Sequence, residues 1–289
     1  MNDPIILLQT GISGLLFGSV YGLIAFGLTL VFALTRLLNF AHGSFMLLAM
    51  YGSMVLSQRF GIDPYLSVLI HVPVFFGIGY LLYRWVFAGL MESELIVVVQ
   101  LTLGFVFIIQ SALQLTFSAD PQTVRTFATN SRLAFGDIVI RTPLIIALVT
   151  AAILAAALFW MLQRTDFGRF IRASVQDPVA AALMGIDVNR VRILAFSIAI
   201  ALLGIAGPLA IPMWVLEPAA GMEITLFGFI VVVLGGMGSF VGAFVGGLIV
   251  GVAEAYGNFF LPGTLAPVVP YALFILMLLF RPSGLFGEA

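Results

Sequence analysis

The stretch GRFIRASVQDPVAAALMGIDVNRVR, Gly168 to Arg192, is a long polar interruption in the second half of an otherwise apolar chain. Three residues in it are typical of helix ends. Asp177 is suited to cap a helix N-terminus, Pro178 to occupy the first helical position, and Gly185 to adopt the left-handed conformation that ends a helix. These signals predict a short helix over residues 178–184, of about two turns at 3.6 residues per turn.

The predicted helix carries small apolar side chains, among them Ala181 and Ala182, and no bulky aromatic face. One interpretation is an amphipathic helix that lies on a membrane surface, which the flanking arginines also permit. The other is a protruding helix that inserts into a groove of another protein. Membrane anchoring favours large aromatic side chains, so the small residues favour docking to a protein.

The composition places this short helix beside a membrane. The chain is 62% hydrophobic and 9% charged, with a mean hydropathy of +1.19. A soluble domain carries about 25% charged residues, and several apolar runs here exceed the roughly 18 residues that span a bilayer. The sequence predicts an all-α polytopic membrane protein, and its formal net charge of -1 argues against nucleic acid as a partner.

Two residue types are missing, and their absence excludes several chemistries. The chain has no Cys, so it can form no disulfide, thiolate metal site or cysteine nucleophile. All twelve basic residues are Arg, which excludes a P-loop ATPase and a lysine Schiff base. His42 and His71 are the only histidines, and no catalytic or metal-binding constellation surrounds them in sequence. If ATP drives this protein, another chain must hydrolyse it.

Apolar runs predict a single domain, 1–289, of eight or nine transmembrane or re-entrant segments. The predicted segments are residues 5–33, 38–57, 64–88, 95–117, 143–163, 193–213, 225–237, 240–257 and 267–280. The first leg of the Gly-rich pair has thirteen residues, which is short for a straight crossing at 1.5 Å per residue. Residues 225–257 are therefore expected either to cross twice with a short leg or to re-enter.

Arginine placement predicts the orientation, because short cytoplasmic loops are enriched in Lys and Arg. If loop 164–192 is cytoplasmic, eight arginines lie inside and four outside. The loop 118–142 is then external, the N-terminus is outside and the C-terminus is cytoplasmic. No basic residue precedes the first apolar run, so we expect that segment to be retained as a span.

Glycines recur at four-residue spacing near both ends of the chain, as Gly14, Gly18 and Gly22 and as Gly238, Gly242 and Gly246. Small residues at this spacing let helix backbones approach closely in lipid. The predicted packing or gating glycines are Gly18, Gly22, Gly235, Gly236, Gly238 and Gly242. The tripeptide Gly43-Ser44-Phe45 recurs at 238–240, which indicates either an internal repeat or the abundance of Gly and Phe.

Polar residues in the predicted spans are candidates for a solute pathway. Asn39, His42 and Ser44 begin the second span, where they either line a break in the helix or serve as a cap and backbone contact. Gln110 and Gln114 share a helix face at i,i+4, and they hydrogen-bond either a solute or a neighbouring helix.

Glu254 is the acidic residue well inside a predicted crossing. A carboxylate buried there costs several kcal/mol unless it is protonated, paired or hydrated. It is therefore expected to face a cavity, a partner subunit or the outer surface.

Four segments and one loop carry a family resemblance. The segments are Gly18–Ala25, Arg36–Gly43, Val233–Ser239 and Arg281–Gly287, and the loop contributes Arg172, Asp177, Ala181, Ala182 and Gly185. Two of these segments, GSVYGLIA and RLLNFAHG, are similar to the family patterns G-S-x-Y-x-L-x-A and R-x-x-N-F-A-H-G. Over nearly its whole length the chain resembles the H-type permease subunit of ABC importers for branched-chain amino acids. It departs at Ser44, where many relatives carry Asp.

The resemblance implies a related second permease subunit, two cytoplasmic ATPases that bind ATP and Mg²⁺, and an external solute-binding protein. It also implies that the 178–184 helix is the coupling helix, with ATPase-contacting residues Arg172, Asp177, Pro178, Ala181, Ala182 and Gly185. The expected solutes are branched-chain or other neutral amino acids, or urea and amides, moved into a bacterium by alternating access. Two alternatives remain at this point: an ion-coupled carrier and a non-transporting scaffold.

Overall fold

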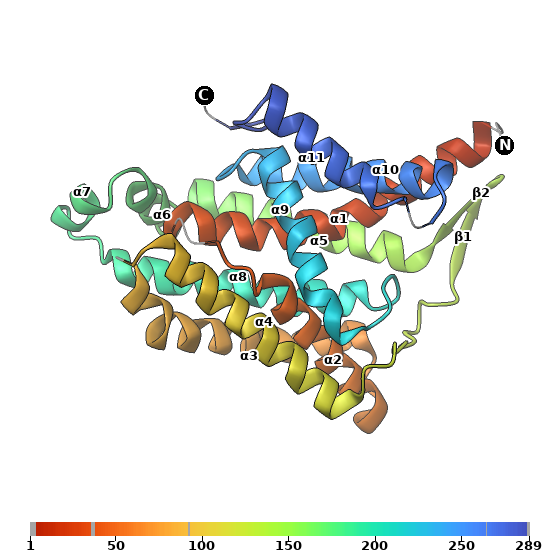
Figure 1. The fold of residues 1–289 in the computed structure, drawn as a ribbon, viewed down its shortest axis with the longest axis horizontal. Helices are drawn as coiled ribbons and strands as arrows, with labels where there is room; N and C mark the ends of the chain where they lie inside the picture. Colours follow the sequence, from red (N-terminus) through yellow and green to blue (C-terminus); the bar gives the residue numbers. More distant parts are fainter. Residues whose placement is uncertain (1–3, 36–37, 92, 264, 288–289) are drawn as a thin grey trace.

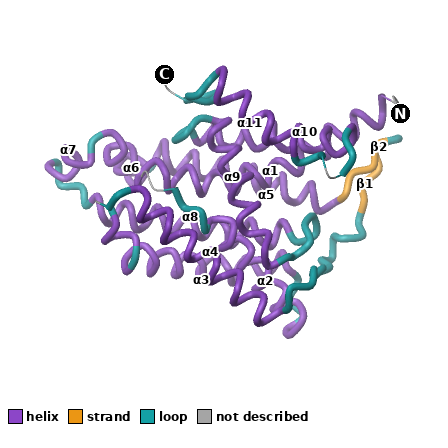
Figure 2. Tube along the Cα trace, in the orientation of Figure 1, coloured by secondary structure: helices purple, strands orange, loops and turns teal. Residues whose placement is uncertain are grey.

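The computed structural model describes residues 4–35, 38–91, 93–263 and 265–287. Arg36, one of the eight arginines expected on the cytoplasmic side, is not among the described residues. The fold is helical throughout its bundle (Figures 1 and 2). Its helices are α1 (Pro4–Thr35), α2 (His42–Phe60), α3 (Pro64–Trp85), α4 (Leu95–Phe117), α5 (Thr142–Arg164), α6 (Asp166–Gln176), α7 (Pro178–Leu183), α8 (Val188–Ala210), α9 (Gly221–Gly235), α10 (Phe240–Phe260) and α11 (Val268–Phe280), with 3-10 turns at Phe87–Leu90 and Pro218–Ala220.

Seven helices in the described part of the chain are long and apolar enough to cross a membrane, namely α1, α3, α4, α5, α8, α10 and the stretch Pro218–Gly235. The sequence predicted eight or nine segments. The difference lies in α2, which has 19 residues but is less apolar, and in α11, which has 13.

Helices α1 and α8 form the centre of the bundle. Both are apolar around their whole circumference, which is the pattern of a helix enclosed by others, and about four-fifths of each spanning window is buried. Helices α3, α4 and α5 lie outside them, with about a fifth of each window buried. Their free faces carry large apolar side chains such as Leu69, Leu115 and Trp160, as expected for surfaces that meet lipid or another subunit.

The glycines of α10 pack against two different helices. Gly247 and Gly251 meet the backbone of α1 at Gly22 and Gly18, whereas Gly242 meets Gly235 at the end of α9. The packing role predicted for Gly238, the first glycine of the series Gly238, Gly242 and Gly246, is wrong. Gly238 lies in the turn before α10 with a φ of +92° and has no atom within 4 Å of a Cβ placed there.

The region 225–257 is a helical hairpin in the structure. Its turn contains Gly236 at a φ of +104°, and the C-terminal segment is hydrogen-bonded to the end of α9 through Leu285 N–H to Leu234 O, 2.9 Å. The predicted first leg of thirteen residues was too short, because α9 begins at Gly221 and includes Glu223 in its first turn. With the preceding 3-10 turn this leg has 18 residues, which is long enough for a crossing.

The predicted external loop, 118–142, contains an antiparallel hairpin that the sequence analysis did not anticipate. Strand β1 (Arg132–Phe135) pairs with β2 (Ile138–Arg141), and the turn uses Gly136 at a φ of +63°. The hairpin lies at one end of the molecule, and α7 lies at the opposite end (Figure 1).

The repeated tripeptide has different structural roles in its two positions. Ser239 caps α10 by accepting a hydrogen bond from Gly242 N–H at 3.1 Å. Ser44 is buried in the first turn of α2 and packs against Gly221. An internal repeat therefore stays a prediction.

Candidate coupling surface and solute cavity

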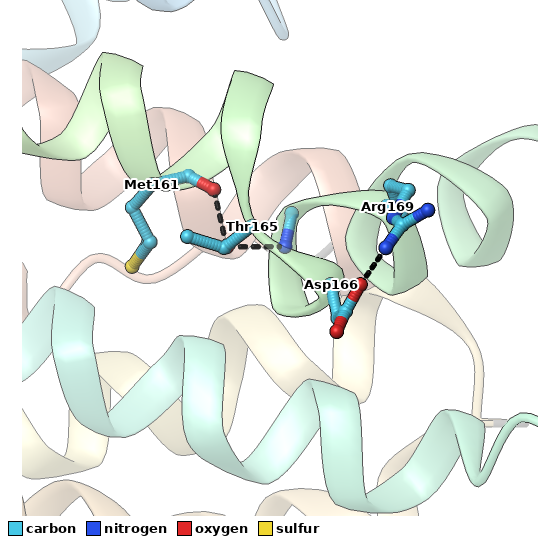
Figure 3. A network of polar contacts seen from close by, with 5 residues as sticks. Met161, Thr165, Asp166 and Arg169 are labelled. Carbon is cyan, nitrogen blue, oxygen red and sulfur yellow. Dashed lines mark hydrogen bonds and ion pairs between the residues drawn. The ribbon is translucent and has the colours of Figure 1, made fainter.

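The elbow between α5 and α6 is fixed by local polar contacts (Figure 3). Thr165 donates to the carbonyl of Met161 at 2.5 Å and accepts from Gly168 N–H at 3.2 Å. Asp166 and Arg169 form an exposed ion pair along α6. Arg172 donates to the carbonyl of Leu162 at the end of α5. Arg172 thus orients α6 on α5 in this chain.

The end signals of α7 are confirmed. The Asp177 carboxylate accepts from the N–H groups of Val179 and Ala180 at 2.9 and 3.0 Å, and Pro178 follows it as the first helical residue. Gly185 has a φ of +86°, and Ile186 N–H donates back to the carbonyl of Ala181 at 3.1 Å. This is the hydrogen-bond pattern of a glycine-terminated helix. The helix ends at Leu183, one residue earlier than predicted.

The exposed surface of α7 differs from the one expected. Ala181 is buried, with 4% of its surface exposed, and therefore faces this chain. The exposed apolar side chains are Val179, Leu183 and Met184, at 69%, 84% and 83%. Ala182 is also exposed. We call Val179, Leu183 and Met184 the α7 tip.

The polar residues at the start of α2 are buried and held mainly by the chain itself. Asn39 accepts from Ala41 N–H at 3.1 Å, and His42 Nε2 lies 3.2 Å from the carbonyl of Ile24 in α1. The hydroxyl of Thr225 in α9 accepts from Gly43 N–H at 2.8 Å. Within the described part of the chain, Asn39 Nδ2 and His42 Nδ1 have no hydrogen-bond partner. The His42 contact agrees with the backbone interpretation, but Asn39 does not cap α2, because the N-cap residue is Ala41 and the Asn39 side chain bonds to Ala41 N–H, ahead of the helix. The His42 and Thr225 contacts join α2 to α1 and α9.

The two glutamines of α4 do not lie on its buried stripe. That stripe comprises Val98, Thr102, Val106, Ile109 and Leu113, whereas Gln110 is half-buried and Gln114 is exposed. Gln110 therefore borders the buried stripe and Gln114 lies on the exposed side of α4.

A cavity of about 340 Å³ lies among α1, α2, α9, α10 and the segment between α8 and α9. Its wall includes three carboxylates, Glu217, Glu223 and Glu254, and the aromatic rings of Tyr21, Trp214 and Phe227. We call this the acidic cavity. It is at the hairpin end of the bundle, since Arg141 of β2 donates to the carbonyl of Pro212 in the same segment at 2.9 Å.

The sequence analysis predicted that Glu254 faces a cavity, a partner or the outer surface, and the structure places it on a cavity wall. It missed Trp214, Glu217 and Glu223, which line the same cavity as Glu254. The acidic pair at 217 and 223 was visible in sequence. Its meeting with Glu254 depends on how α10 packs beside α1 and α9, which the sequence does not give.

Known proteins similar to this chain are permeases. The family model described as branched-chain amino acid transport system / permease component matches residues 11–278.

The chain belongs to this permease family. It is 30% identical to the high-affinity branched-chain amino acid transport system permease protein BraD of Pseudomonas aeruginosa, over 97% of this chain and 96% of BraD. It is 31% identical to LivH of Salmonella typhimurium, with the same two coverages. A probable LivH of Methanocaldococcus jannaschii is 28% identical over 94% of this chain and 90% of its own.

A solved structure shares the fold. PsaBC from Streptococcus pneumoniae in complex with Fab matches with a TM-score of 0.52 and 14% identity, over 95% of this chain and 92% of that chain. Together these findings identify an ABC importer permease that crosses the membrane several times, and they support this function over an ion-coupled carrier. As a permease component, the chain works with ATPase and solute-binding components.

Proposed function

We propose that this permease carries a branched-chain or other neutral amino acid, with urea or a short amide as the second candidate class. The relatives that match over nearly the whole chain are permeases of branched-chain amino acid systems, and this supports the first class. The site for the solute would be the acidic cavity, which combines apolar aromatic surface with carboxylates.

The coupling role of α7 is carried by one observation, the exposed α7 tip. Three large apolar side chains on a capped two-turn helix stand clear of their own chain. Such a surface is stabilised when it is buried in a groove, at about 25 cal/mol per Å² of apolar area. The tip lies at the end of the molecule opposite the hairpin (Figure 1), where the arginine-rich loop predicts the cytoplasm.

The proposed assembly has two permease subunits in a bacterial inner membrane, two cytoplasmic ATPases and an external solute-binding protein. ATP and Mg²⁺ would be held by the ATPases, because this chain has no P-loop lysine. ATP binding would close the ATPase pair, move α7 and shift the permeases between outward-facing and inward-facing states. The N-terminus would lie outside and the C-terminus inside.

Reconstitution tests this proposal. The permeases, ATPases and binding protein are placed in proteoliposomes and the uptake of radiolabelled L-leucine is measured with ATP, with a non-hydrolysable analogue, and with an imposed ion gradient alone. We expect uptake with ATP only. Uptake driven by the gradient without the ATPases would overturn the importer mechanism. In a parallel assay, uptake of radiolabelled urea with no leucine uptake would overturn the amino-acid class in favour of the second class.

A further inference from the structure

The acidic cavity gathers negative charge on its wall. Its wall includes Glu217, Glu223 and Glu254 and, among the described residues, no Arg or His. Arg141 lies on the wall of an adjoining cavity that Glu254 also lines. A carboxylate removed from bulk water is costly unless it is paired with a cation or hydrogen-bonded. Glu254 is half-buried, whereas Glu217 and Glu223 are exposed. The desolvation cost therefore falls on Glu254, and a positively charged solute group bound there would offset it.

Glu254 supplies an independent sign of a missing partner. Its Oε2 atom is buried and has no hydrogen-bond partner among the residues that the structure describes. Tyr21 lies beside Glu254, and Glu223 is near enough to interact with both. The unpaired oxygen thus belongs to a carboxylate whose neighbours on the wall are a phenol and a second carboxylate.

The aromatic part of the wall suits an organic cation. Tyr21 stacks on Phe227 with ring centroids 5.2 Å apart, and Trp214 is 5.6 Å from Tyr21 at an interplanar angle of 51°. Faces of Trp and Tyr attract ammonium groups, and the same rings provide apolar area for an aliphatic side chain. The described residues contain no group of three or more His, Cys, Asp or Glu placed to hold a metal ion, so the carboxylates are too dispersed for a metal site.

We propose that Glu223 and Glu254 bind the ammonium group of the transported solute in the acidic cavity, with the solute's apolar part against Trp214 and Tyr21. Glu217 adds to the negative potential at the rim. This inference rests on the proposed function and narrows it, because an amino acid carries an ammonium group and urea or an amide does not. The cavity therefore selects between the two solute classes.

A matched pair of probes isolates the ammonium group. Leucinamide and 4-methylpentanamide share their amide and side chain and differ in the amino group alone. Binding is followed by tryptophan fluorescence of the permease–ATPase complex in nanodiscs. Trp85 and Trp160 of this chain are 74% and 63% exposed on its outer faces, so both are changed to Phe. The signal that a further Trp214→Phe change removes is assigned to Trp214.

We expect leucinamide to change the Trp214 signal saturably and 4-methylpentanamide to leave it unchanged. Glu223→Gln and Glu254→Gln keep the side-chain shape and should each raise the apparent Kd for leucinamide by about tenfold or more, as the loss of a charge-assisted contact does. Asp137→Asn is the control, since it removes a carboxylate from the exposed hairpin turn outside the cavity.

The proposal is overturned if both probes bind alike, if Trp214 does not respond to leucinamide, or if both glutamine variants bind leucinamide as the parent does. The probe pair gives its answer on the parent complex even if a variant fails to assemble. If the parent complex shows no ATP-driven leucine uptake, the proposed function itself is contradicted. Uptake that persists while the probes bind alike would contradict the ammonium site alone.

Discussion

Gly18 of α1 and Gly251 of α10 meet backbone to backbone, so closely that a Cβ on Gly251 would overlap the Cα of Gly18. Gly22 and Gly247 repeat this contact one turn along the same helix pair. Since α1 is central to the bundle and α10 forms part of the acidic cavity, the glycines set how closely the cavity wall approaches the core.

Gly251→Ala is expected to destabilise the permease. The added methyl group must displace a helix backbone and not a flexible side chain, and overpacking of this kind costs about 1–3 kcal/mol. The melting temperature in detergent measures the effect. Gly104→Ala in α4 is the matched control, because nothing lies within 4 Å of a Cβ there. Equal melting temperatures for the two variants would contradict the packing account.

Leu183→Asp is expected to uncouple the transporter while leaving it inserted. Leu183 is 84% exposed, so the change costs the isolated chain little, but it places a charge in the middle of the proposed apolar contact. We expect ATP-dependent uptake to fall about tenfold or more, as for a lost interface anchor. Asn189→Asp adds the same charge at an exposed position near the start of α8 and should leave uptake unchanged. Normal uptake by Leu183→Asp would remove the coupling role of the α7 tip.

Thr225→Val is expected to loosen the contact between α2 and α9. The Thr225 hydroxyl accepts from Gly43 N–H at 2.8 Å and lies 2.9 Å from the carbonyls of Phe40 and Gly221. Val keeps the side-chain shape but leaves the buried Gly43 N–H without a partner, a loss of about 1–3 kcal/mol. Thr225→Ser restores the hydroxyl and should recover most of the melting temperature. A Val variant as stable as the parent would show that this bond contributes nothing measurable.

The sequence predicted those features that depend on local chemistry. The cap at Asp177, the proline at the helix start and the left-handed Gly185 are each decided by neighbouring backbone groups, so the short helix was predicted to within one residue. The membrane class followed from apolar runs. The glycine spacing predicted close packing, although only the structure identifies α1 and α9 as the two partners of α10.

Other features depend on tertiary contacts and were predicted incorrectly or not at all. Ala181 was expected on the docking surface, but α7 packs on its own chain with Ala181 inward and Leu183 exposed. Glu223 lies in the interval 214–224 that the sequence analysis left between predicted segments, yet α9 includes it in its first turn. Its proximity to Glu254 results from packing between distant segments, and no local pattern encodes that.

The central claim is that the α7 tip is buried by an ATPase in the assembled transporter. The chain has no native cysteine, so Leu183→Cys introduces one thiol whose maleimide labelling can be measured on this subunit, with and without the ATPases. The account predicts rapid labelling of the permease alone and strong protection in the complex. Equal labelling rates in both samples would contradict it.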